Sequence, residues 1–349
     1  MLVATAVLTL VVLFLLNPLA KHVRLLDHPD GDRKLHAGSV PLTGGIVLLV
    51  TLLIVFAASS LSDAPLTNAD NFWSVTAIVL TLLVLIHAID DVIEMRALSR
   101  FTIDALLAFG LWSYASVQLF SLGDLFGLGE IVIVRSAILM TIFSFVAASN
   151  AFNMVDGIDS LCSGLGLVCF GTLVTMILLS GSPVDAPLVE ILLVVMAALV
   201  VLYLANLGLL GPRLRIFLGD AGARLIGFIA AIALIQAAQA GMIRPVMAYF
   251  AIAVPVCDCL ALMGQRALQG RSPLSADRLH LHHLLGDLGF SDSQVRRMII
   301  TSALGMSLFG FFFQITNTPE WVVSVFVVTT FAVFIGMRLW LIRRVATRA

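Results

Sequence analysis

Two adjacent carboxylates, Asp90 and Asp91, are the first residues of this sequence whose type and position could do chemistry. They follow an apolar segment, for which we predict a helix over residues 73 to 89. Both therefore lie at its carbonyl end, where the helix dipole disfavours a negative charge by roughly 0.3 to 1 kcal/mol. A metal ion or several cations nearby would reverse that sign. A solvated helix end is the plainer alternative, but adjacent acids beside so apolar a segment are costly and usually functional.

A second pair of acids, Asp156 and Asp159, lies in the segment SNAFNMVDGIDSLCSG. Its glycine interrupts the helix, and Asn150 and Asn153 add amide donors and acceptors. Such a loop can bind a base edge, a ribose or a metal ion. Capping of the next helix by Asp159 or Ser160 is the alternative, although it needs neither both acids nor both asparagines.

A fifth carboxylate, Asp220, stands in IFLGDAGA directly before an apolar segment. Helix capping explains it by itself. The flanking Gly219 and Gly222 also favour a close approach of the backbone to a ligand, and a helix N-terminus offers free N–H groups for phosphate.

Two basic segments complete the set of candidate residues. Arg33, Lys34 and His36 precede the Gly44-Gly45 start of an apolar segment, where cations beside a helix N-terminus predict an anion site and a topological anchor is the alternative. The second segment, RALQGRSPLSADRLHLHHLLGDLGFSDSQ, could hold zinc, form a structural polar loop, or clamp a pyrophosphate. We favour the clamp because no cysteine accompanies the histidines and the cations suit an anion. Its candidate residues are Arg266, Arg271, Arg278, His280, His282 and His283.

The elements that position these residues are membrane spans. The chain has 349 residues, of which 60% are hydrophobic and 12% charged, whereas a soluble domain carries roughly 25% charge. Its apolar runs are near the roughly 20 residues that cross a bilayer as a helix. We predict an all-α polytopic membrane protein with about eleven spans, at residues 2 to 16, 44 to 60, 73 to 89, 101 to 119, 131 to 149, 162 to 180, 187 to 205, 223 to 240, 245 to 264, 298 to 315 and 320 to 341.

The charges predict the orientation. The first span lacks a basic start and a cleavage site, so we expect a retained helix with the N-terminus outside and the C-terminus cytoplasmic. Of the 20 Lys and Arg residues, all but Arg135 and Arg244 then face inward, as the positive-inside rule requires. All seven histidines and most acids, Asp258 among them, gather there too, which that rule does not explain. One transferase domain over residues 1–349 would thus carry a site built from loops 17–43, 90–100, 150–161, 206–222 and 265–297.

The expected chemistry is phosphoryl transfer. Carboxylates of this kind suit Mg²⁺ or Mn²⁺, which bind through a few carboxylates together with substrate phosphates. Positioning and charge neutralisation supply most of the catalysis in such reactions. Because the site lies at the membrane surface, we expect one lipid substrate and one water-soluble substrate. The net charge of −1 gives no indication of nucleic-acid binding.

Five motifs in order carry a family resemblance: RKLHAGSVPLTGG, IDDVIEM, NAFNMVDGIDSL, FLGDAGA and SPLSADRLHLHH. The chain resembles the polyprenyl-phosphate N-acetylhexosamine-1-phosphate transferases, and its histidine segment is most similar to the undecaprenyl-phosphate N-acetylglucosamine branch. The resemblance implies that undecaprenyl phosphate attacks the β-phosphorus of a UDP-sugar and releases UMP, which starts cell-envelope polysaccharide synthesis at the bacterial inner membrane. A different UDP-N-acetylhexosamine, such as a 6-deoxy sugar or the MurNAc-pentapeptide, is an alternative donor.

The resemblance also implies roles for single residues. Asp90 and Asp91 would orient or deprotonate the lipid phosphate and help hold the metal, and Asp220 would be a direct ligand. Asn153, Asp156 and Asp159 would line the nucleotide and metal region, with Asn150 beside them. The substrate anions would meet Lys34, Arg266, Arg278, His280, His282 and His283.

The chain departs from the family pattern at two positions. Leu98 replaces a basic residue, for which Arg96 or Arg100 is a candidate substitute, and Ala223 replaces a serine. A transporter or flippase is the main rival from another class, but it predicts charges near mid-span and internal repeats, whereas the acids lie at helix ends and the five motifs do not recur. An inactive membrane scaffold would not need acids at several helix ends. The sequence leaves open whether the chain is a monomer or a homodimer.

Overall fold

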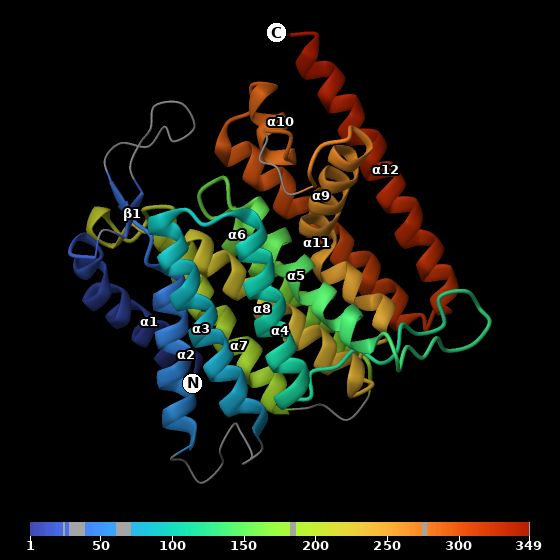
Figure 1. Cartoon of the computed structure of the whole chain (residues 1–349), viewed down its shortest axis with the longest axis horizontal. Helices are drawn as coiled ribbons and strands as arrows, with labels where there is room; N and C mark the ends of the chain where they lie inside the picture. Colours follow the sequence, from blue (N-terminus) through green and yellow to red (C-terminus); the bar gives the residue numbers. More distant parts are fainter. Residues whose placement is uncertain (24, 28–38, 61–70, 182–185, 274–277, 349) are drawn as a thin grey trace.

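The computed structural model describes residues 1–23, 25–27, 39–60, 71–181, 186–273 and 278–348, and these residues form a bundle of helices (Figure 1). A two-residue antiparallel pair, β1 (Leu26–Asp27) and β2 (Val40–Pro41), lies at one end. The helices of the described part are α1 (Leu2–Leu16), α2 (Gly44–Ser60), α3 (Asn71–Ile93), α4 (Ala97–Tyr114), α5 (Ala137–Val155), α6 (Leu161–Leu179), α7 (Ala186–Asn206), α8 (Gly219–Gln239), α9 (Ala248–Leu268), α10 (Leu281–Asp287), α11 (Asp292–Ile315) and α12 (Glu320–Ala346).

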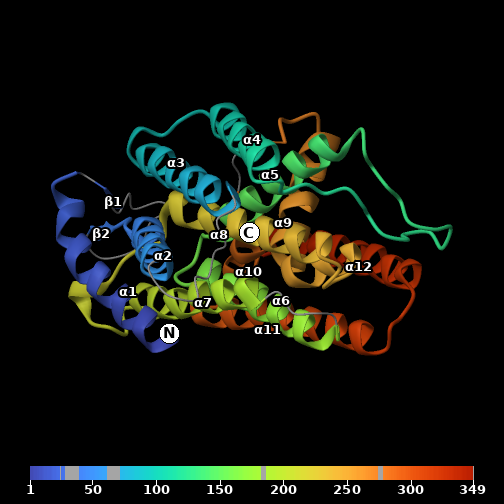
Figure 2. The same cartoon turned by 90° about the horizontal axis from the view of Figure 1, so that it is seen from below.

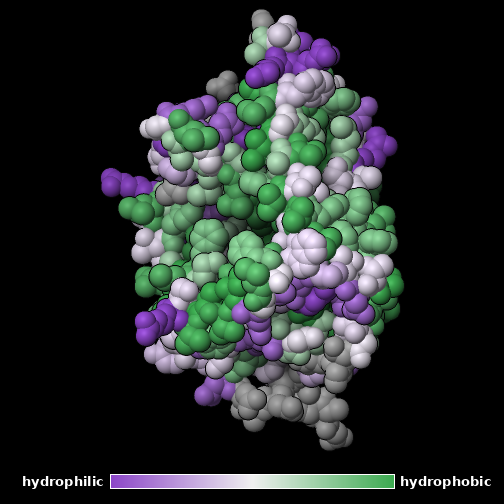
Figure 3. Space-filling view, turned by 90° about the vertical axis from the view of Figure 1, so that its right-hand side faces the viewer, coloured by the Kyte–Doolittle hydropathy of each residue, from purple (hydrophilic) through white to green (hydrophobic). Residues whose placement is uncertain are grey.

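Nine helices of the described part are long and apolar enough to cross a membrane, namely α1, α3, α5, α6, α7, α8, α9, α11 and α12. Apolar side chains cover most of the middle of the face seen in Figure 3, and hydrophilic ones gather toward its ends. The prediction of an all-α polytopic membrane protein is confirmed. The other two predicted spans are the 17-residue α2 and the 18-residue α4, so the count of eleven and the inward or outward orientation stay predictions.

Helix α8 occupies the middle of the bundle (Figure 2) and packs against α2, α3, α5 and α6. Of the apolar stretch of α8 that is long enough to cross a membrane, 89% is buried. Apolar residues occupy all faces of this helix, and neighbouring helices cover them. The end of α3 meets the beginning of α8, since the Asp220 N–H donates to Asp91 Oδ1 at 3.0 Å. This junction brings residues that are 129 positions apart in sequence into one site.

Two glycines let α2 and α8 approach at their N-termini. A Cβ atom on Gly45 would lie 2.5 Å from the backbone nitrogen of Gly222, which leaves no room for any side chain. The neighbouring backbones are hydrogen-bonded as well, from Gly45 N–H to Leu218 O at 3.1 Å and from Phe217 N–H to Pro41 O at 2.8 Å. The close backbone approach at Gly222 is made to helix α2 in this structure.

The structure corrects the predicted spans at 101 to 119 and 131 to 149. Helix α4 ends at Tyr114 and α5 begins at Ala137, with an irregular segment between them that holds a bridge from Ser121 to Val132. Glycines at positive φ, including Gly123 at 77°, break the apolar run into turns. The segment packs on the start of α12, where the Asp124 N–H donates to Glu320 Oε2 at 3.1 Å.

Helix α9 bends near its beginning and leads into the histidine segment. Ile252 has non-helical backbone angles (φ −124°, ψ 15°) three residues before Pro255, which cannot donate a helical hydrogen bond. The short α10 follows, and a capping box of Ser291 and Gln294 begins α11, with the Ser291 N–H donating to Gln294 Oε1 at 2.9 Å. Helix α10 and the C-terminus lie at one end of the bundle, whereas the N-terminus lies toward the other (Figure 1).

Candidate active site

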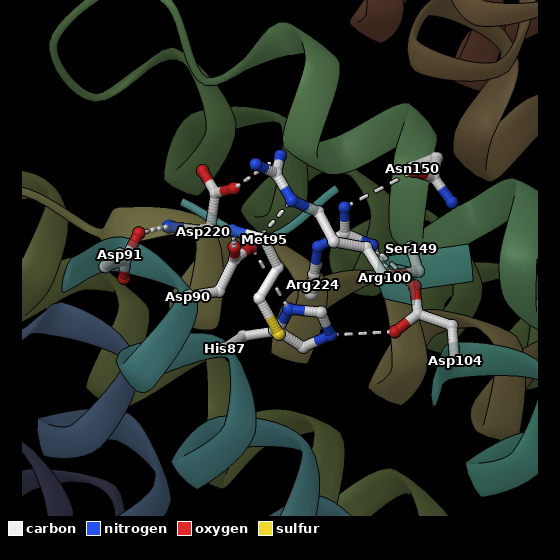
Figure 4. Close-up of polar contacts among 10 residues, drawn as sticks. All are labelled: His87, Asp90, Asp91, Met95, Arg100, Asp104, Ser149, Asn150, Asp220 and Arg224. Atoms are coloured by element: carbon white, nitrogen blue, oxygen red, sulfur yellow. Dashed lines mark hydrogen bonds and ion pairs between the residues drawn. The ribbon is translucent and has the colours of Figure 1, made fainter. Parts of the chain in front are cut away.

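The adjacent acids Asp90 and Asp91 point to different partners (Figure 4). Asp90 is 2% exposed, and its oxygens accept hydrogen bonds from Met95 N–H at 2.7 Å and face Arg100 Nε at 2.8 Å. Asp91 accepts the Asp220 N–H through Oδ1, while its buried Oδ2 has no hydrogen-bond partner among the described residues. Asp90 is thus neutralised within the protein, and Asp91 is not.

Asp220 begins α8 beside Asp91. Gly219 adopts φ +73°, and a Cβ atom there would lie 2.8 Å from Asp91 Oδ2, so only glycine permits this junction. The Asp220 side chain is 36% exposed and lies 3.5 Å from Arg100 Nη1. Arg100 therefore lies between Asp90 and Asp220, whereas Leu98 is 69% exposed.

Asp156 completes a group of three acids that we call the acidic corner: Asp91, Asp156 and Asp220. Burial raises the pKa of the Asp156 carboxyl well above its ordinary value, and repulsion from Asp220, Asp91 and Asp159 raises it further. The described residues contribute no set of three His, Cys, Asp or Glu side chains arranged as a ready metal cluster. The unpartnered Asp91 oxygen and the repulsion around Asp156 nevertheless fit a hard divalent cation that enters with a phosphate.

The loop that carries Asp159 is fixed by its neighbours. Ser160 adopts a left-handed conformation (φ 63°), with its N–H donating to Asn206 Oδ1 and its hydroxyl to Tyr203 O at 2.9 Å. Asp159 pairs with Arg215 at 3.1 Å through half-exposed side chains. Neither Asp159 nor Ser160 caps α6 with a side chain, so the capping alternative does not explain these acids.

A buried row of charges lies behind Asp90, and sequence reasoning missed most of it. His87 Nε2 is 2.8 Å from Asp104 Oδ1, and Asp104 Oδ2 is 2.5 Å from Arg224 Nη1. All three side chains are at most 2% exposed. Together with Asp90 and Arg100 they form the buried ion chain, in which basic and acidic side chains alternate in the order Arg100, Asp90, His87, Asp104 and Arg224 (Figure 4).

The buried ion chain also changes the interpretation of two predicted features. Asn150 accepts a hydrogen bond from Arg224 Nη2 at 3.4 Å and donates to Val146 O at 2.7 Å. Both ends of its amide are therefore hydrogen-bonded within the protein. Asn153, one turn further along α5, is half-buried. Asp104 lies within α4, so the expectation that the acids lie at helix ends is wrong for this residue, whose carboxylate is paired with His87 and Arg224.

The three histidines form a tight cluster. The His282 and His283 ring centroids are 4.2 Å apart, and the His280 ring stacks on that of His282 at 5.7 Å. A Cβ atom on Gly157 would lie 2.2 Å from His282 Nε2, so the cluster packs against the loop of Asp156 and Asp159. Burial lowers the pKa of His282 well below its ordinary value, and the charges of His283, His280 and Arg278 lower it further.

The cations of the segment divide into inner and outer ones. Arg266 is 3% exposed and donates to Pro273 O at 2.9 Å, which links the end of α9 to the chain that follows it. Arg278 is half-exposed and lies 3.7 Å from Asp287. Burial also lowers the pKa of His283, with Arg278 and His280 adding to the effect. Arg33, Lys34 and His36 lie outside the described residues.

Comparison with known proteins identifies the family. The profile of glycosyl transferase family 4 matches residues 72–238, which include both the acidic corner and the buried ion chain. A Yersinia pestis protein named undecaprenyl-phosphate alpha-N-acetylglucosaminyl 1-phosphate transferase is 35% identical over 325 residues, which cover 92% of this chain and 86% of that protein. This chain belongs to glycosyl transferase family 4.

Two further relatives have the same name as the Yersinia pestis protein. The protein from Escherichia coli strain K12 is 34% identical over 336 residues, 95% of this chain and 89% of that protein. The protein from Haemophilus influenzae is 31% identical over 325 residues, 92% and 87% respectively. The family predicted from the five motifs is confirmed, and the similarity extends over nearly the whole chain, beyond the stretch that the family profile matches.

Proposed function

We propose that this chain transfers N-acetylglucosamine 1-phosphate from UDP-N-acetylglucosamine to undecaprenyl phosphate, releasing UMP and leaving a lipid-linked diphosphate sugar. The names of relatives that align over more than 90% of the chain support this activity. The observation that carries the proposal is the acidic corner at the junction of α3 and α8, where Asp91 has a buried oxygen without a hydrogen-bond partner among the described residues. A divalent cation bound there would be a partner for this oxygen.

Mg²⁺ is the cation we propose for the acidic corner, with Mn²⁺ as a substitute. Asp91 and Asp220 would be its protein ligands, with Asp156 close enough to add charge. Bound there, it would neutralise charge on the diphosphate of the donor. Asp90 has both oxygens engaged by Met95 and Arg100, so we assign it to orienting Arg100 rather than to direct ligation.

The residues of the chain itself would then align two anions. Arg100, which is partly exposed between Asp90 and Asp220, would hold the phosphate of the lipid. An oxygen of that phosphate forms a bond to the β-phosphorus, and the bond from the β-phosphorus to the bridging oxygen breaks, with the electron pair leaving on UMP. His282 is held neutral by burial, so its ring can donate one hydrogen bond and accept another.

Opposite the acids, the histidine segment would cover the donor. His280, His282, His283 and Arg278 would contact the diphosphate or the sugar, and Asn153 and Asp159 the nucleotide. Lys34 would meet the anionic substrates from the first loop. We propose that this face lies on the cytoplasmic side of the bacterial inner membrane, because the UDP-sugar is a water-soluble substrate and the basic residues gather there.

The direct test measures UMP. Purified protein in lipid nanodiscs is incubated with undecaprenyl phosphate, Mg²⁺ and a panel of UDP-N-acetylhexosamines, with Asp220→Asn as the inactive control. We expect UMP release with UDP-N-acetylglucosamine that depends on both the lipid and the metal. Release with a 6-deoxy sugar or the MurNAc-pentapeptide instead would change the donor but keep the reaction class. No release with any donor would refute the proposal.

A further inference from the structure

A carboxylate outside the acidic corner lies directly behind the histidine cluster. Asp258, at the middle of α9, is 1% exposed. Its Oδ2 is 3.0 Å from Nδ1 of His280, and its Oδ1 accepts the N–H of Leu281 at 3.1 Å. One buried side chain therefore holds both the ring and the backbone of the histidine segment at the point where α10 begins.

A residue of α12 also holds the start of the histidine segment in place. Arg338 of α12 is 2% exposed, donates to Leu279 O at 2.7 Å and to Gln265 Oε1 at 3.0 Å, and lies 4.0 Å from Asp258 Oδ1. The carbonyl before His280 and the N–H after it are thus both held by buried charged groups. Burying two charges is costly unless they are paired and hydrogen-bonded, and here they are both.

The hydrogen bond also determines which nitrogen of His280 carries a proton. A carboxylate only accepts hydrogen bonds, so Nδ1 is the donor toward Asp258 and Nε2 is left to act on a ligand. The orientation of the His280 ring also constrains the His282 ring, because the two rings stack with an interplanar angle of 10°. His282 in turn packs on Gly157, between Asp156 and Asp159.

We propose that Asp258 is a positioning residue for the transfer reaction, which fixes the ring orientation and the Nδ1–H tautomer of His280 so that Nε2 acts on the donor diphosphate. Arg338 holds Asp258 and the preceding carbonyl in place. The proposal rests on the proposed function, since it assumes that His280 works on a diphosphate. It assigns a role to a residue that none of the five sequence motifs contains.

The decisive variant is Asp258→Asn, which keeps the size of the side chain and reverses the hydrogen bond. The asparagine oxygen still accepts the Leu281 N–H, while its NH₂ group donates to Nδ1 and moves the ring proton to Nε2. We expect kcat to fall by about 100-fold, the lower end of what proton-transfer groups contribute, with KM for the UDP-sugar changed by less than about threefold. Asp258→Glu should recover part of kcat.

A double variant separates positioning from general damage. If Asp258 acts through His280, the double variant Asp258→Asn, His280→Gln has the same kcat as His280→Gln alone. Both substitutions then remove the same contribution of His280 to kcat, and it can be lost only once. Multiplying losses, or a wild-type kcat in Asp258→Asn, would overturn the proposal. Asp292→Asn, an exposed acid in the first turn of α11, is the matched control and should leave kcat unchanged.

A measurement without turnover keeps the proposal distinct from the proposed function. In protein labelled with ¹⁵N-histidine, with His280→Gln used to assign the signal, Nδ1 of His280 should carry the proton in the wild type. In Asp258→Asn, Nε2 should carry it instead. The same tautomer in both proteins would refute the proposal even if UMP is released. If Asp258→Asn does not fold, Arg338→Met is measured in its place and should broaden or shift the same signal.

Discussion

Asp90 and Asp91 are neighbours in sequence but belong to two regions with opposite electrostatics. Asp90 is part of the buried ion chain, in which Arg100, His87 and Arg224 balance the carboxylates of Asp90 and Asp104. Asp91 is part of the acidic corner, where it faces Asp220 and Asp156 with one oxygen unpartnered among the described residues. Consecutive residues on a helix point about 100° apart, and this separates the two side chains.

The difference indicates what each region is for. In the buried ion chain the protein supplies every counter-charge, so removing one member leaves a buried charge without its partner, and the cost falls on stability. In the acidic corner the three acids repel one another, and we expect this repulsion to exceed the single 3.5 Å contact between Asp220 and Arg100. Removing one acid should then relieve the folded state, and the cost falls on function. The variants below test this division, beginning with the largest expected effect.

Asp220→Asn should lower UMP release by about 100- to 1,000-fold, the loss typical of removing one preorganised electrostatic group. Without metal, its thermal midpoint should equal or exceed that of the wild type, because one of three mutually repelling acids is gone. The backbone N–H to Asp91 is retained. Initial rates and thermal unfolding in the same nanodiscs check both parts. A strongly lowered midpoint would place Asp220 among structural residues instead.

Arg224→Met should have the opposite pattern, with a loss of stability of about 3–5 kcal/mol, because it removes the arginine from Asp104, which is 0% exposed and keeps only neighbours such as His87 and the Ser149 hydroxyl. Adding Asp104→Asn should recover part of this loss, with a coupling of about 0.5–3 kcal/mol. Unfolding midpoints of the two single variants and the double variant give the cycle. Additive losses would mean that the two residues do not act as a pair.

Removal of the metal tests the acidic corner alone. Mg²⁺ at about 100 times its dissociation constant should stabilise the wild type by about 2.7 kcal/mol over protein in EDTA. Asp91→Asn should abolish this difference, whereas Asp104→Asn, a matched change in the buried ion chain, should retain it. An equal Mg²⁺ response in all three proteins would locate the metal away from the corner.

The sequence was sufficient for the helices and for the residues that stand in motifs. Long apolar runs predict membrane helices, and the ends of such runs place Asp90, Asp91 and Asp220 on one face. The errors fall at residues 115–136, where apolar side chains continue through glycine turns and hydropathy alone cannot mark the helix ends.

Side-chain pairing was beyond the sequence for a different reason. His87, Asp104 and Arg224 lie on three different helices, α3, α4 and α8, and no motif spacing relates them. Only packing brings His87 within 2.8 Å and Arg224 within 2.5 Å of Asp104. The same holds for Asp258, whose partner His280 is 22 residues away and lies beyond the end of α9. The one available signal was the cost of burying a charge in an apolar helix.

The smallest expected effect comes from the ion pair between Arg215 and Asp159, whose side chains are 35% and 37% exposed. Arg215→Ala should change stability by no more than about 1 kcal/mol, since water already screens both charges. If Asp159 lines the nucleotide as proposed, the same variant should alter KM for the UDP-sugar more than kcat, because it frees a carboxylate near a bound anion. A steady-state comparison with Arg297→Ala, a change to an exposed arginine of α11 that donates to Ser293 O within the helix, isolates this effect. A stability loss as large as that of Arg224→Met would break the division between buried and exposed charges.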